Sequence, residues 1–234
     1  MSAPATSPGQ SASSLEEIRA TRLQKVATLQ QLGLNPFAYR WPVTAHAAEL
    51  QDRYTDLAPG EEVAVPVCLA GRIVARRVFG KLAFFSLQDE TGTIQLYLDK
   101  AEIQTAMAAI DGDAFTHLKQ LTDVGDILGV KGTVKRTEKG ELSIKVGEYA
   151  ILTKALLPLP DKWHGLTDVA KRYRQRYVDL IVNPTVRETF RRRALITSGI
   201  RRYLEDRGFL EIETPVDRKS TRLNSSHLVI SYAV

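Results

Sequence analysis

The sequence predicts an α+β protein in which a five-stranded β-barrel follows an N-terminal helix and precedes a second helical region. Three observations support this prediction. Residues 61–153 are rich in β-branched and aromatic side chains with alternating polarity, apolar residues at helical spacing come before them, and a second helical pattern comes after them. A chain of 234 residues is long enough for one or two domains.

The N-terminal part divides into a tail and a helix with its connection. Residues 1–14 are rich in Ser, Ala and Pro without periodicity, so we expect a disordered tail. Within 15–60, apolar residues from Leu15 to Leu32 recur at helical spacing, and Gly33 is placed to end the helix. The rest of 15–60 is a connection with room for one short helix near 45–53.

Five strands and one helix are predicted for residues 61–153. The strands are expected at 63–77, 82–89, 93–99, 127–137 and 141–153, and the helix at about 101–121. Glycines in short polar stretches punctuate the strands. Three strands, a helix and two strands is the order of the OB-fold, a Greek-key barrel whose exposed face and loops bind oligonucleotides.

The remaining sequence has three parts. Residues 154–165 contain two prolines and a glycine, which predicts a linker. In 166–216 a helix is expected near 185–207, followed by a short strand at 209–213. Residues 217–234 resemble the translation of a sequencing-library adapter, and we expect an artefactual tail.

The charge of the chain is uneven. The net charge is +5, and residues 161–207 alone hold 12 basic and 6 acidic side chains. This excess fits either a footprint for a polyanion or a solvated helix face. No apolar run could span a bilayer, and the start lacks the features of a signal peptide, so we expect a cytoplasmic protein with no membrane partner.

A search for catalytic or metal-binding residues finds none. The single cysteine, Cys68, excludes an internal disulfide and a cysteine-based zinc site. The four histidines are scattered and none has metal-ligand spacing. The sequence also lacks a Walker-type phosphate loop and a nucleophile elbow. We therefore predict neither a catalytic nor a metal site.

The barrel strands carry the candidate binding residues. Alternation places Arg76 and Arg77 on opposite faces, so only one of them can line a groove. Phe84 and Phe85 also point opposite ways; either one of them is a stacking platform for a base or both belong to the core. Single-stranded RNA is read by stacking on aromatics and by hydrogen bonds to base edges. Two polar residues could supply such bonds, Gln95 and Glu141.

Five stretches of the sequence resemble class II lysyl-tRNA synthetases, in that family's order, over about residues 15–216. They are AGRIVARRVFGKLAFFSLQDETGTIQLYL, GDILGVKGTVKRTEKGELSI, ILTKALLPLPDKWHGL, RYRQRYVDLI and RGFLEIETP. The resemblance implies an OB-fold anticodon-binding domain at 61–153 and the start of a class II catalytic domain at 166–216. It also implies a homodimeric ligase that uses ATP and Mg²⁺ to attach lysine to lysine tRNA.

The resemblance also assigns residues. It implies that Phe84 stacks on an anticodon uridine, with Arg76, Gln95 and Glu141 in the same pocket. The helix near 185–207 and the text FLEIETP resemble motif 1 of the class, which forms the dimer interface. The residues assigned to that interface are Ile200, Tyr203, Leu204, Phe209 and Pro215.

The sequence departs from the family in one large respect. Motifs 2 and 3, which bind ATP and metal in the family, are missing, so no catalytic residue can be transferred and we expect this chain to be inactive alone. Two other functions remain open, a free-standing OB-fold RNA-binding module and a relative of aspartyl- or asparaginyl-tRNA synthetases. A binding module has no need of RYRQRYVDLI or GFLEIETP, which argues against the first. Lysine is favoured over the second by the stretches KALLPLPDKWHGL and RYRQRYVDL.

Overall fold

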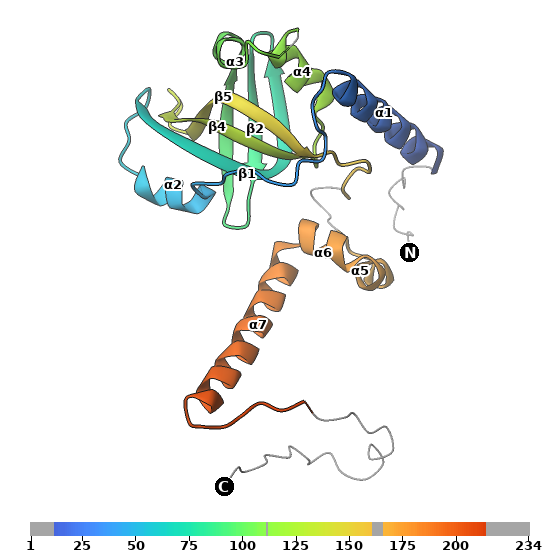
Figure 1. Cartoon of the computed structure of the whole chain (residues 1–234), viewed down its shortest axis with the longest axis vertical. Coiled ribbons are helices and arrows are strands. Elements are labelled where there is room, and N and C mark those ends of the chain that lie inside the picture. The colour runs from blue at the N-terminus through green and yellow to red at the C-terminus, as the bar shows by residue number, and fades with distance from the viewer. Residues whose placement is uncertain (1–11, 111, 161–165, 214–234) are drawn as a thin grey trace, which may run out of the picture. The chain divides into compact units, whose positions relative to one another are not determined.

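The computed structural model describes residues 12–110, 112–160 and 166–213 (Figure 1). The chain divides into two units, Met1–Pro158 and Leu159–Val234. The tail predicted at 217–234 lies outside the described residues, as do parts of the N-terminal tail at 1–14, of the linker at 154–165 and of the region 166–216.

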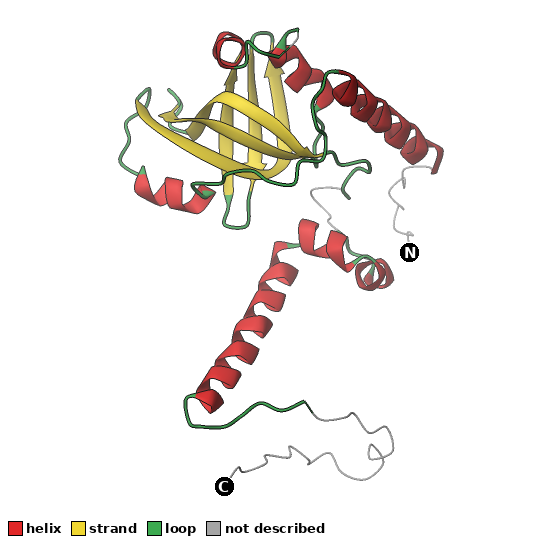
Figure 2. Ribbon diagram, viewed as in Figure 1, coloured by secondary structure: helices red, strands yellow, loops and turns green. Residues whose placement is uncertain are grey.

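The first unit is built around a closed barrel of five strands (Figure 2). Around the barrel the strands follow the order β1-β2-β3-β5-β4, and only β3 and β5 are parallel. This confirms the predicted OB-fold. The elements are α1 (Ala12–Gln31), α2 (Ala47–Arg53), β1 (Glu62–Phe79), β2 (Leu82–Gln88), β3 (Thr93–Asp99), α3 (Lys100–Ala106), α4 (Ala114–Leu121), β4 (Ile127–Arg136) and β5 (Leu142–Thr153).

The long strand β1 closes the barrel because it pairs on both sides. Its first half pairs with β4 and its second half with β2, and Arg72 has a partner on each. Strands β2 and β3 alternate strictly between buried and half-buried residues. Their inward side chains include Phe85, which is 1% exposed. The alternation that predicted the strands is therefore the alternation that fills the core.

The structure corrects the single helix predicted at about 101–121. Two shorter helices occupy this region, α3 and α4. Gly112 has a positive φ of 86°, and the side chain of Asp113 accepts a hydrogen bond from Thr116 N, which caps α4. The sequence is rich in Ala and Leu on both sides of Gly112, which favours one continuous helix. Gly112 followed by Asp113 is nevertheless a typical signal for the start of a new helix.

A buried charge cluster, which we call the Lys154 cluster, lies where β5 ends. It consists of Lys25, Asp123, Asp126 and Lys154. The side chains of Lys154 and Asp126 are both fully buried, with Nζ and Oδ2 2.6 Å apart, and Lys154 also contacts Asp123. Lys25 joins Asp123 from helix α1, with Nζ and Oδ1 2.7 Å apart. The cluster thus ties α1, the turn before β4 and the end of β5 together.

The segment that leaves the barrel is held by Asp126 of this cluster and by Arg22. Asp126 Oδ1 accepts a hydrogen bond from Ala155 N at 2.8 Å. Arg22 of α1 donates to the carbonyl oxygens of Ala155 and Leu157 at 2.7 and 3.1 Å.

Burial by itself would raise the pKa of Asp123, but hydrogen bonds from Lys154 and Lys25 outweigh burial and lower that pKa below its ordinary value.

The described residues of the second unit form three helices, α5 (Val169–Arg174), α6 (Arg176–Val182) and α7 (Pro184–Glu205). Helix α7 confirms the helix expected near 185–207, whereas α5 and α6 were not predicted. The buried carboxylate of Asp179 on α6 accepts hydrogen bonds from Arg172 Nε at 3.0 Å and from Asn183 Nδ2 at 2.6 Å, and it also contacts Arg176. This carboxylate joins α5 and α6 to Asn183, the residue that directly precedes α7.

The strand predicted at 209–213 is wrong, because these residues have no regular secondary structure. A strand needs a partner, and the described part of the chain supplies none beside it.

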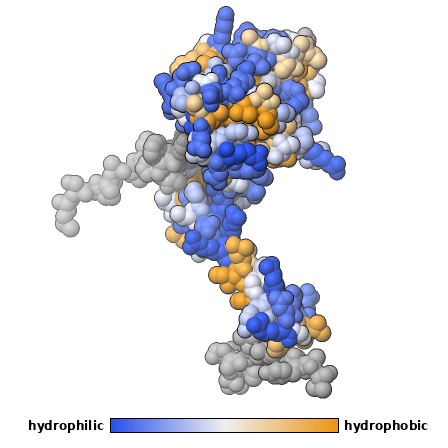
Figure 3. All heavy atoms as spheres, turned by 90° about the vertical axis from the view of Figure 1, so that its left-hand side faces the viewer, coloured by the Kyte–Doolittle hydropathy of each residue, from blue (hydrophilic) through white to orange (hydrophobic). Residues whose placement is uncertain are grey.

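One side of α7 is apolar and exposed, and orange side chains stand among blue ones on the surface of this unit (Figure 3). No helix within the described ranges is long and apolar enough to cross a membrane.

Candidate nucleic-acid interface

The pairing of β2 with β1 on one side and with β3 on the other defines an outer face of the barrel. Phe84 lies opposite Arg77 on β1 and opposite Tyr97 on β3. Directly paired residues share a face of the sheet. Arg77, Phe79, Phe84, Gln95 and Tyr97 therefore lie on the outer face, whereas Phe85 belongs to the core. The structure places Phe84 outward and Phe85 inward.

Three aromatic rings form a row on the outer face, which we call the aromatic row. The ring centroids of Phe79 and Phe84 are 6.3 Å apart with an interplanar angle of 68°. Those of Phe84 and Tyr97 are 5.5 Å apart at 79°. The ammonium of Lys135 lies 5.0 Å from the centre of the Tyr97 ring. Partly exposed rings on a β-sheet are platforms on which nucleobases stack.

The assignment of Arg76 to the pocket of Phe84 is wrong. Arg76 pairs with Phe85, and its guanidinium lies 4.9 Å from the centre of that buried ring. It donates hydrogen bonds to the carbonyl oxygens of Lys119, at 2.6 Å, and Thr122, at the C-terminal end of α4. Burial lowers the pKa of Arg76, partly offset by Asp123 and Asp126. Arg76 therefore holds α4 against the barrel and does not face a ligand.

Arg77 is the cation that accompanies Phe84. Its side chain is exposed and has no hydrogen bond or ion pair within the part of the chain that the structure describes. Sequence reasoning missed it, although a signal was present. Gly80 and Lys81 form a two-residue turn, and counting back from that turn pairs Phe79 with Leu82 and Arg77 with Phe84.

The polar residues Gln95 and Glu141 are linked through Ser143. Gln95 pairs with Ser143 on the parallel strand β5, and its Nε2 donates to Ser143 Oγ at 2.9 Å. Ser143 Oγ in turn donates to the carbonyl oxygen of Glu141 at 3.3 Å. Neither Gln95 Oε1 nor the Glu141 carboxylate has a partner among the described residues, so both can accept hydrogen bonds from a base edge.

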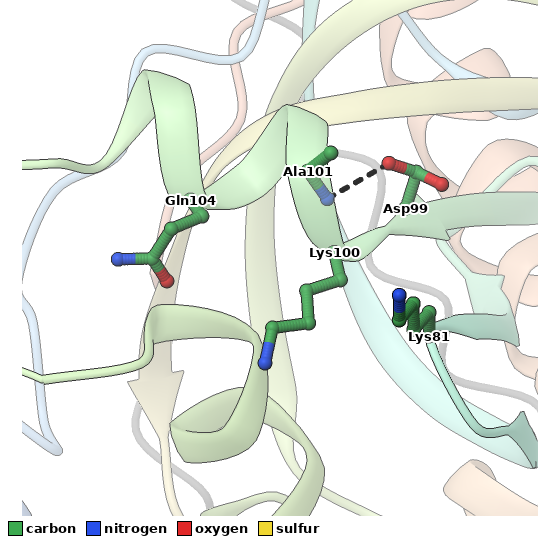
Figure 4. Close-up of a pocket in the computed structure, with 5 residues that line it drawn as sticks. All are labelled: Lys81, Asp99, Lys100, Ala101 and Gln104. Carbon is green, nitrogen blue, oxygen red and sulfur yellow. Dashed lines mark hydrogen bonds between the residues drawn. The ribbon is translucent and has the colours of Figure 1, made fainter.

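A cavity of about 290 Å³ lies beside the turn between β1 and β2 (Figure 4). It is lined by Lys81, Asp99, Lys100, Ala101 and Gln104. The Asp99 carboxylate accepts a hydrogen bond from Ala101 N at 2.9 Å, and Lys100 forms an ion pair with Asp113. Lys81 has no ion pair among the described residues. The cavity therefore offers one unpaired ammonium group close to the aromatic row.

The residues assigned to a dimer interface lie on or after α7. The side chains of Ile200 and Tyr203 are more than half exposed, and Leu204 is 38% exposed. Phe209 is half-buried, and Pro215 lies outside the described residues. The described ranges contain no group of three or more His, Cys, Asp or Glu side chains that could hold a metal ion.

Two family models match the sequence. Residues 67–152 match a model described as an OB-fold nucleic acid binding domain, which spans most of the barrel and the outer face. Residues 168–231 match a model described as tRNA synthetases class II (D, K and N). The second match covers helices α5 to α7 and continues past residue 217, where the sequence predicted an artefactual tail.

The chain is also similar to curated lysine–tRNA ligases. It is 78% identical over 201 residues to that of Nostoc punctiforme, which covers 86% of this chain and 36% of the relative. It is 72% identical over 217 residues to that of Trichormus variabilis, covering 93% and 39%. For Thermosynechococcus vestitus the identity is 68% over 200 residues, covering 86% and 39%. The chain thus spans less than two fifths of the length of these relatives.

Proposed function

The chain belongs to the lysine–tRNA ligase family, and from this premise we propose that the outer face of its barrel binds the unpaired anticodon nucleotides of lysine tRNA. The observation that carries the proposal is the position of Phe84. Its ring lies half-buried on the outer face, next to two other aromatic rings and opposite Arg77, which has no ion pair among the described residues.

Each side chain has a distinct role in this proposal. Phe84 stacks on one base, which is a sequence-tolerant interaction because every base has a flat face. Gln95 and Glu141 accept hydrogen bonds from the edge of that base and supply selectivity. Arg77 lies close to the RNA backbone and neutralises phosphate charge.

The activity of the whole protein is also part of the proposal. We assign to it the ATP- and Mg²⁺-dependent attachment of lysine to tRNA, as a homodimer in the cytoplasm in which the apolar face of α7 contacts the second subunit. No step of that reaction is assigned to the described residues. An RNA-binding module without a ligase relationship would have no use for α5 to α7, and the curated relatives favour lysine over aspartate or asparagine.

Salt dependence and Arg77 test the proposal together. We expect the 234-residue chain to bind a hairpin RNA carrying the lysine anticodon with an affinity that falls steeply with salt, because each phosphate contact releases counterions. Arg77→Gln should reduce the slope of log affinity against log salt by about 1. Fluorescence anisotropy of the labelled hairpin measures both quantities.

The matched control is Arg76→Gln, which makes the same charge change one residue away on the opposite face. It should leave the salt slope unchanged and instead lower the free energy of unfolding, because it removes the hydrogen bonds to α4. Equal slopes for Arg77→Gln and the unchanged chain would contradict the role of Arg77. Binding that does not respond to salt would contradict the proposed function.

A further inference from the structure

We propose that Phe79, at the tip of the β1–β2 hairpin, holds a second unpaired nucleotide beside the one on Phe84. This inference rests on the proposed function and extends it, since it assigns two adjacent nucleotides of one RNA strand to two neighbouring rings. It is based on the exposure of Phe79, on the angle between the two rings, and on the ammonium group of Lys81, which has no ion pair among the described residues.

Phe79 is a large apolar side chain that the fold leaves in solvent. It is 60% exposed, although the adjoining strands bury most of their apolar residues. It shares the outer face with Phe84, because Phe79 pairs with Leu82 and Arg77 pairs with Phe84. The ring is therefore continuous with the proposed anticodon site and adds little to the barrel core.

The geometry of the rings excludes a single base stacked on both. The planes of Phe79 and Phe84 differ by 68°. Stacking requires nearly parallel planes, so a base that stacks on Phe84 meets Phe79 at an edge. A base stacked on Phe79 must belong to another nucleotide, turned out from its neighbour, as happens when single-stranded RNA is read.

The cations around the aromatic row favour the hairpin end over the opposite end as the place where the second nucleotide binds. At the opposite end Tyr97 is covered by Lys135, whose ammonium lies 5.0 Å from the ring centre. At the hairpin end Lys81 follows Phe79 by two residues, lines the cavity of about 290 Å³, and has no ion pair among the described residues. Its ammonium is therefore available to the phosphate of the nucleotide on Phe79.

These features select RNA as the occupant. The rings are set at an angle to each other, and Arg77 and Lys81 lie on the same hairpin, which suits a splayed, negatively charged strand. They do not suit the continuous apolar face of a partner helix. Arg77 and Lys81, neither of which has an ion pair among the described residues, lie on either side of Phe79 in the sequence.

The test uses the full 234-residue chain and hairpin RNAs that carry the lysine anticodon. One RNA is unmodified, and three others each lack the base at one anticodon position. Binding is measured by fluorescence anisotropy for the unchanged chain, Phe79→Ala, Phe84→Ala and Phe79→Trp. Val78→Ala is the matched control, since Val78 lies on the same hairpin on the opposite face and is 39% exposed.

We expect Phe79→Ala to weaken binding of the unmodified hairpin about five- to tenfold, Phe79→Trp to restore it, and Val78→Ala to leave it unchanged. In Phe79→Ala, removal of one particular base should not weaken binding any further, because the ring that stacks on that base is already gone. In Phe84→Ala the same should hold for a different base, adjacent to the first. If removal of the same base has no further effect on the affinity of both variants, Phe79 only supports the Phe84 ring, and the inference is overturned.

Failure of the inference and failure of the proposed function are distinguishable. If Phe84→Ala weakens binding and Phe79→Ala does not, only the second nucleotide position is lost. If neither variant changes binding, the outer face does not bind this RNA, and both proposals are overturned. A loss with Phe79→Ala that is equal for all three base-lacking RNAs would mean general contact and would also contradict a second nucleotide position.

Discussion

Replacing Lys154 by methionine will lower the free energy of unfolding of the barrel unit by about 3–5 kcal/mol. Methionine has a similar length and fills the same space, but it leaves Asp126 as a fully buried charge without its cation. Breaking one partner of a buried pair costs far more than the pair contributes, since desolvation of the remaining charge is no longer compensated. Urea denaturation followed by circular dichroism measures the loss.

The matched control is Lys131→Met. Lys131 forms an ion pair with Glu148, and these two side chains are 46% and 47% exposed. It should change the free energy of unfolding by less than about 1 kcal/mol. A loss in Lys154→Met no larger than that in Lys131→Met would show that the Lys154 cluster does not hold the fold together.

The same cluster predicts a response to acid. The pKa of Asp123 is lowered in the folded chain from its ordinary value of 3.8. Asp123 therefore stabilises the fold above about pH 4, and this contribution is lost as the pH falls through the lowered pKa. Lys154→Met removes one cause of that lowering, so the stability of this variant should depend less on pH in the acid range.

Replacing Phe84 by alanine will weaken binding of the lysine-anticodon hairpin by about 5- to 150-fold, corresponding to the roughly 1–3 kcal/mol lost when a stacking ring is truncated. Phe84 lies on the outer face, and its neighbours across the strands, Arg77 and Tyr97, lie on that face too. The variant should therefore remain folded, as circular dichroism can verify. Fluorescence anisotropy at fixed salt gives the change in affinity.

Two other phenylalanines serve as comparisons. Phe37→Ala removes a ring that is 41% exposed and lies outside the strands, and it should leave the affinity unchanged. Phe85→Ala removes a core ring and should cost about 3–5 kcal/mol of stability. A larger loss of affinity in a folded Phe85→Ala than in Phe84→Ala would contradict the faces assigned to the two residues.

The barrel could be predicted from sequence because local pattern and tertiary structure agree there. Strands β2 and β3 alternate between buried and half-buried positions, so the same period that marks them as strands also separates Phe84 from Phe85. The choice between Arg76 and Arg77 needed the register as well. Alternation shows only that they face opposite ways, whereas the turn at Gly80 decides which of them accompanies Phe84.

Other features depend on contacts that a single sequence does not reveal. The Lys154 cluster joins side chains that are separated by up to 129 positions, from Lys25 to Lys154, and nothing in the local sequence of either marks the contact. Helices α5 and α6 are too short to show a long apolar repeat in the sequence, and the Asp179 carboxylate holds them together. The strand expected at 209–213 has the pattern of a strand but no described partner.

Photochemical crosslinking identifies the strands that contact the anticodon. The lysine-anticodon hairpin is prepared with a photoactivatable thiouridine at each anticodon position in turn, bound to the full chain, irradiated, and digested for mass spectrometry. We expect crosslinks to peptides that contain Phe79, Phe84 or Tyr97 on the outer face. Crosslinks confined to α1, or to α5 through α7, with none on β1, β2 or β3, would contradict it.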